Sequence, residues 1–105
     1  MERSEKLATY IKEIASNFIE RESNKTALIS ITRVELTDRD RSAMIYISVL
    51  PESGEESALN FLKRKRKDMR EAVKNGLRVR TIPFLDVAID TGEKAVRTIE
   101  SLLKQ

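Results

Sequence analysis

The chain contains no cysteine, no histidine and no tryptophan. Without cysteine it can form neither a disulfide scaffold nor a thiolate nucleophile. Because histidine is also absent, zinc-finger ligand sets and catalytic triads are excluded as well. Only carboxylates, hydroxyls, lysine and arginine remain available for chemistry.

Little in the sequence indicates an enzyme. Asp38 and Asp40 are close enough to act as a carboxylate pair, but a polar hairpin turn explains them better. The chain has no glycine-rich phosphate loop and no nucleophile beside a base. We therefore expect a protein without enzymatic activity, metal, cofactor or small-molecule substrate.

Long apolar runs are missing too. No stretch approaches the roughly 18 residues that a membrane span needs, and the first residues lack the apolar core of a signal peptide. With 105 residues, 35% charged and 40% hydrophobic, the chain is expected to form one globular domain over residues 1–105. We expect a monomer in the cytoplasm with no membrane partner.

The small net charge of +3 conceals an uneven distribution of charge. Residues 63–80 contain nine basic and two acidic residues, whereas the remainder of the chain is net acidic. A block of like charge destabilises a fold unless a partner neutralises it. A solvated helix face or a nuclear-import signal would also be basic, so the charge run alone does not identify a polyanion-binding site.

Five consecutive basic residues, Lys63 to Lys67, favour a polyanion-binding role. Such a run covers more than half of a helix's circumference, so it cannot form only the solvated face. Phosphate contacts need positive charge and donors but no sequence code. The predicted RNA contacts are Lys63, Arg64, Lys65, Arg66, Lys67 and Arg70, followed by Lys74, Arg78 and Arg80. Arg33, Arg39 and Arg41 have acidic neighbours, which favours surface ion pairs.

Apolar periodicity predicts the secondary structure. The expected elements are a helix over 4–22, strands over 27–37 and 42–50, a helical stretch between Ala58 and Leu77, a third strand within residues 78–90 and a last helix over 93–104. Pro83 restricts the third strand to a sheet edge or to a start at Phe84. The apolar phase of the first strand flips near Thr32, which predicts a bulge. The apolar stripe of the helical stretch is interrupted by Lys65 and Arg66, which predicts a bend between residues 63 and 69.

Two further expectations concern single residues. Gly76 is expected to end a helix with a positive φ. Tyr10, Phe18, Phe61 and Phe84 are expected in the core, which leaves Tyr46 as the only aromatic candidate for an exposed sheet face. RNA recognition is therefore expected to use shape and backbone charge rather than stacking.

The order of elements is helix, strand, strand, broken helix, strand, helix. It is the order of a type II KH domain, an α+β fold in which a three-stranded sheet packs on helices, here with a kinked helix pair and a C-terminal helix. Fold alone does not define function.

The sequence resembles the bacterial ribosome-binding factor A family along essentially its whole length. Three segments carry the resemblance, over residues 31–38, 43–50 and 77–90, and Glu13-Ile14-Ala15 in the first helix also fits. The chain departs from the family where Lys65-Arg66-Lys67 replaces the usual Ala-x-Gly of the kink, and it has no Gly-x-x-Gly clamp.

The resemblance implies a noncatalytic KH-like RNA-binding domain. Its partners would be the immature small ribosomal subunit (30S) and its 16S rRNA, and its role would be in rRNA maturation, 30S assembly and cold adaptation. The alternative is a KH-like protein-interaction module whose last helix or open sheet edge binds a protein, with only incidental RNA contact.

Overall fold

The computed structural model describes residues 2–37, 39–77 and 81–92. In chain order the elements are α1 (Glu2–Glu22), β1 (Leu28–Thr37), β2 (Ser42–Leu50), the 3-10 turn η1 (Glu52–Gly54), α2 (Glu55–Arg64), α3 (Arg66–Leu77) and β3 (Phe84–Ile89). The α+β order that the sequence predicts is confirmed over these residues. The helix expected over 93–104 lies outside them.

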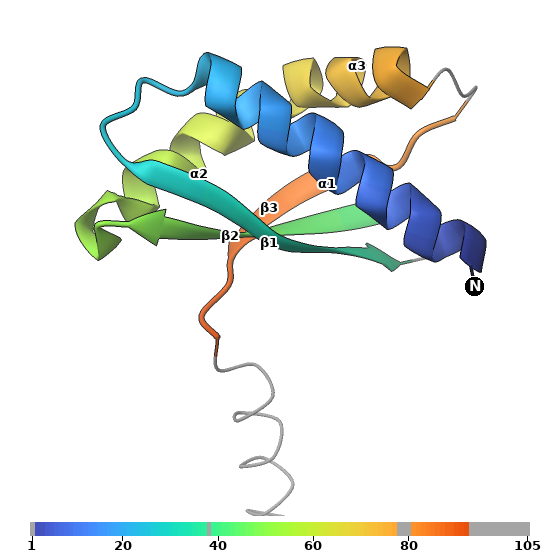
Figure 1. Cartoon of the computed structure of the whole chain (residues 1–105), viewed down its shortest axis with the longest axis horizontal. Helices are drawn as coiled ribbons and strands as arrows, with labels where there is room; N and C mark the ends of the chain where they lie inside the picture. Colours follow the sequence, from blue (N-terminus) through green and yellow to red (C-terminus); the bar gives the residue numbers. More distant parts are fainter. Residues whose placement is uncertain (1, 38, 78–80, 93–105) are drawn as a thin grey trace, which may run out of the picture.

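The three strands form one sheet in the order β1-β2-β3. β1 and β2 are an antiparallel hairpin, while β3 runs parallel to β2, with Ser42 opposite Phe84 and Ile47 opposite Ile89. A parallel pair needs a long crossover, which α2 and α3 provide. All three helices lie on the same face of the sheet (Figure 1).

A bulge in β1 accounts for its change of apolar phase. The register moves directly from Ile31 opposite Ile47 to Arg33 opposite Tyr46, so Thr32 has no partner in the ladder. Because of this extra residue, Ile31 before it and Val34 after it both belong to the helix-covered face. The predicted bulge is confirmed.

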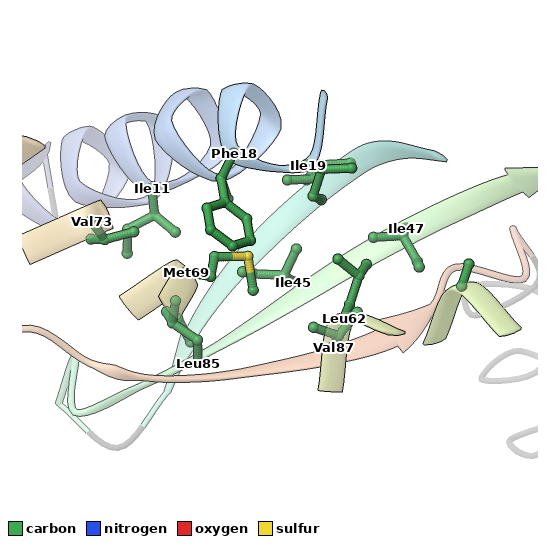
Figure 2. Close-up of a cluster of buried hydrophobic side chains, with 14 of the residues drawn as sticks. Ile11, Phe18, Ile19, Ile45, Ile47, Leu62, Met69, Val73, Leu85 and Val87 are labelled. Carbon is green, nitrogen blue, oxygen red and sulfur yellow. The ribbon is translucent and has the colours of Figure 1, made fainter. Parts of the chain in front are cut away.

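The core lies between the sheet and the three helices. Side chains from α1, β2, β3 and the helix pair point into a common interior, among them Phe18, Ile45, Met69 and Val87 (Figure 2). The buried face of β2 is the predicted alternation of Ala43, Ile45, Ile47 and Val49. Because Leu62 and Met69 both pack into this core, the chain bends between them, where α2 ends and α3 begins.

Two of the aromatic predictions are wrong. Tyr10 is 48% exposed and Phe84 is 71% exposed, whereas Phe18 is buried as expected. Tyr10 lies at the edge of the apolar stripe of α1, next to the fully buried Ile11. Phe84 pairs with Ser42 and shares its face, whereas the next residue, Leu85, belongs to the core.

The expectation for Gly76 is also wrong. Gly76 lies inside α3 and does not have a positive φ. Its lack of a side chain instead accommodates Ile14 of α1, because a Cβ atom at this position would lie 2.6 Å from Ile14 Cδ1. The glycine allows two helices to approach each other closely.

Candidate nucleic-acid interface

The basic run forms an elbow, defined here as residues 63–67, between two helices. α2 ends at Arg64 and α3 begins at Arg66, and Lys65 between them has φ −97° and ψ 5°. The Lys65 N–H donates to the carbonyls of Phe61 and Leu62, each at 3.1 Å. The break turns the basic residues away from the core while Leu62 and Met69 on either side stay fully buried. The predicted bend is confirmed (Figure 1).

Several of the predicted contact residues are free cations on the surface. Lys63 and Arg64 in the last turn of α2, and Lys67 and Lys74 in α3, are exposed. Within the described ranges their side chains form no ion pair and no hydrogen bond. A phosphate could bind any of these groups without breaking an existing contact.

Lys65 and Arg66 form weak contacts at the surface. The Lys65 ammonium lies 3.8 Å from Glu22 and 4.0 Å from Asp68, with the side chain 37% exposed. The Arg66 guanidinium donates to Asp86 Oδ1 at 3.1 Å and to the Lys63 carbonyl at 3.2 Å. Exposed pairs of this kind contribute only about 0–1 kcal/mol, so both groups can exchange their partners for a phosphate.

Arg70 differs from the other predicted contact residues because much of its side chain is buried. Its Nη2 donates to the Ile82 carbonyl at 2.9 Å and its Nε to the Pro83 carbonyl at 3.2 Å. The same guanidinium lies 5.1 Å from the centre of the Phe84 ring. Through these contacts Arg70, a residue of α3, binds the segment that leads into β3.

The remaining arginines divide into three groups. Arg78 and Arg80, both predicted contacts, lie outside the described residues. Arg33 lies 3.1 Å from Glu35 and 3.8 Å from Asp90 and stacks on Tyr46 at 4.0 Å, so the expected ion pairing is present. The surface location expected for it is not observed, because the Nε and Nη2 atoms of Arg33 are buried. Arg39 and Arg41 are exposed at the hairpin turn.

The elbow places cations at both ends of helix dipoles. Lys63 and Arg64 lie in the last turn of α2, where the partial negative charge of the helix end favours them. Arg66 lies at the start of α3 with Lys67 beside it, where the partial positive charge disfavours cations unless an anion neutralises them. An anion bound at the elbow would therefore stabilise the start of α3.

A hollow of about 590 Å³ lies beside the elbow, at the start of β3. The cations Arg66, Lys67 and Arg70 line it together with Phe84 and Asp86. Aromatic stacking was not expected from the sequence, because Phe84 was assigned to the core. The alternation of Leu85 and Val87 with Phe84 and Asp86 was the signal that could have placed Phe84 on the opposite face.

Two other kinds of site are absent from the described residues. No helix in this part of the chain is both long enough and apolar enough to cross a bilayer. Nor do three metal-binding side chains gather there in a way that could hold an ion.

The element order, the parallel β2–β3 pair and the helix-covered sheet define the class as a type II KH-like α+β domain. The family model described as Ribosome-binding factor A matches residues 3–103. The chain therefore belongs to the ribosome-binding factor A family.

Individual relatives cover nearly the whole chain. Ribosome-binding factor A of Coprothermobacter proteolyticus is 31% identical, with 98% of this chain and 80% of the relative aligned. That of Clostridioides difficile is 28% identical over 98% of this chain and 83% of the relative.

Solved structures show the same fold. The crystal structure of ribosome-binding factor A from Thermus thermophilus has a TM-score of 0.74 at 22% identity, covering 82% of this chain and 93% of that one. A homology model of the Thermus thermophilus protein, fitted into a cryo-EM map of its complex with the 30S subunit, has a TM-score of 0.68 at 22% identity. That alignment covers 77% of this chain and 88% of the fitted one.

Proposed function

We propose that this protein is a noncatalytic assembly factor that binds the maturing 30S ribosomal subunit and contacts its 16S rRNA through the elbow. It acts as a single-domain monomer in the cytoplasm, supports maturation of the rRNA, including during growth in the cold, and leaves before translation. Family membership supports the partner, since a Thermus thermophilus relative was fitted into a map of its 30S complex.

The observation that carries the proposal is the set of cations at the bend that have no partner within the described part of the chain. Lys63, Arg64 and Lys67 are exposed around one break in the chain, and Lys74 follows in the same helix. Phosphates of structured RNA are recognised through charge and shape, which such a cluster supplies. Arg66 adds to it once its contact with Asp86 is exchanged.

The salt dependence of binding to a small-subunit rRNA fragment tests this function. Each phosphate contact contributes about 0.7–0.9 to the logarithmic slope, so four contacts give a slope of about −3 to −4. A slope near zero, with binding that instead depends on ribosomal proteins, would favour the protein-interaction module. Co-sedimentation with precursors of the small subunit, in comparison with mature subunits, tests the role in assembly.

A further inference from the structure

Phe84 is an aromatic side chain on the surface in the middle of a basic site. It is 71% exposed at the first residue of β3, although its neighbour Leu85 is buried. A single exposed apolar residue is common and needs no explanation. What distinguishes Phe84 is its position, because its ring lines the same hollow as Arg66 and Lys67.

The ring of Phe84 is held in place rather than free. Arg70 stacks against it at 5.1 Å, and the guanidinium is itself fixed by two backbone carbonyls, those of Ile82 and Pro83. The Phe84 N–H donates to the Arg41 carbonyl at 2.9 Å, which anchors the backbone as well. A ligand that stacks on this ring therefore loses little conformational entropy of the protein.

The surroundings of the ring carry net positive charge. Lys67 is exposed and unpartnered among the described residues, and Arg66 is 46% exposed with Asp86 as its partner. Arginine and aromatic residues are common in protein interfaces too, but lysine is depleted there, whereas an aromatic ring beside cations suits a base attached to a phosphate.

We propose that this hollow, the Phe84 pocket, binds one unpaired nucleotide of RNA. The base stacks on the exposed ring of Phe84, and Lys67 and the exposed part of Arg66 bind the adjoining phosphates. The proposal rests on the RNA-binding function proposed above and adds a base contact that the elbow cations do not supply. A base within a duplex is stacked already and cannot enter, so the pocket selects single-stranded or bulged RNA.

Because the chain contains no tryptophan, the fluorescence of a tryptophan introduced at Phe84 reports stacking directly. Phe84→Trp keeps an aromatic ring in the pocket and introduces a single indole, whose emission a stacked base quenches. The RNA probes are a short single-stranded oligonucleotide and an abasic oligomer of the same length and charge. Quenching by the first and none by the second is the expected result. Leu28→Trp is the control, because Leu28 is 63% exposed and lies at the opposite end of β2 from Ser42, the partner of Phe84.

Phe84→Leu removes the aromatic face and keeps an apolar side chain. Stacking on an aromatic ring contributes about 1–3 kcal/mol per base, so affinity for the oligonucleotide should fall between about 5-fold and about 150-fold. Affinity for the abasic oligomer should not change. The elbow variant Lys63→Glu/Lys67→Glu should weaken binding of both oligomers.

These variants test the Phe84 pocket and the proposed RNA-binding function independently. If Phe84→Leu binds the oligonucleotide as tightly as the wild type and the indole is not quenched, the Phe84 pocket is overturned. The elbow variant then decides the function, which survives if that variant still loses affinity and fails if it does not. An indole that responds to a ribosomal protein but not to RNA would replace the proposal with a protein-binding surface.

Discussion

Gly76 of α3 faces Ile14 of α1 so closely that a Cβ atom at the glycine would lie 2.6 Å from Ile14 Cδ1. In an exposed helix, Gly→Ala gains about 1 kcal/mol of stability. Here we expect Gly76→Ala to gain nothing or to destabilise the protein, because Ile14 must move. Chemical denaturation of the variant measures this.

A double-mutant cycle isolates the contact between the two helices. In an Ile14→Ala background the space beside Gly76 is open, so Gly76→Ala should then stabilise the protein by about 1 kcal/mol. Equal effects of Gly76→Ala in both backgrounds would show that Ile14 does not restrict the space at position 76.

Arg70→Lys is predicted to destabilise the protein although it keeps the charge. Lysine cannot reproduce the two bonds to the Ile82 and Pro83 carbonyls or the flat contact with Phe84. We expect a loss of about 1–3 kcal/mol in the free energy of unfolding. Lys74→Ala, at an exposed position of the same helix, should change it by no more than about 0.5 kcal/mol.

Asp86→Asn is predicted to strengthen RNA binding. The change removes a negative charge from the rim of the Phe84 pocket and reduces the 3.1 Å ion pair with Arg66 to a hydrogen bond with a neutral amide, which a phosphate displaces more easily. Affinity for the rRNA fragment should rise. The slope of log affinity against log salt concentration should become more negative by about 0.7–0.9, the contribution of one phosphate contact. Glu13→Gln, which alters the charge equally at an exposed site on α1, should leave the slope as it was.

Charge reversal at the elbow is predicted to weaken RNA binding without affecting the fold. Lys63→Glu/Lys67→Glu should lower affinity for the rRNA fragment roughly 10-fold or more. The matched variant Lys6→Glu/Lys12→Glu makes the same change in net charge at exposed positions of α1. Similar losses in both variants would mean that net charge, rather than the elbow, determines binding.

Features encoded over a few adjacent residues were predictable from the sequence. The flip of apolar phase at Thr32 placed the bulge, the gap in the apolar stripe at Lys65 placed the bend, and Pro83 set the start of β3. The bulge and the bend follow from the requirement that polar groups avoid the core, and the start of β3 follows from the missing N–H of proline.

Features that depend on distant partners were not predictable. The role of Gly76 depends on Ile14, which lies 62 residues earlier in the chain. Likewise, the positive charge of Arg70 predicted a phosphate contact. Its structural role was missed because the two carbonyls that it binds belong to Ile82 and Pro83, in the segment before β3. The exposure of Phe84, by contrast, could have been inferred from its alternation with the buried Leu85 and Val87, whereas its position beside Arg66 and Lys67 depends on distant partners.

The bulge at Thr32 also has a consequence for self-association. β1 is a ten-residue strand at the edge of the sheet, and a regular edge offers a template on which another chain can pair. Deleting Thr32 would leave Ile31 and Val34 on their present faces, because the register on both sides already matches that of β2. Thr32 bonds through its side chain, since its hydroxyl contacts the Tyr46 carbonyl at 3.2 Å and the Asp90 carboxylate. Its place in the strand also interrupts the outer row of hydrogen-bonding groups, and this interruption hinders growth of the sheet into a fibre.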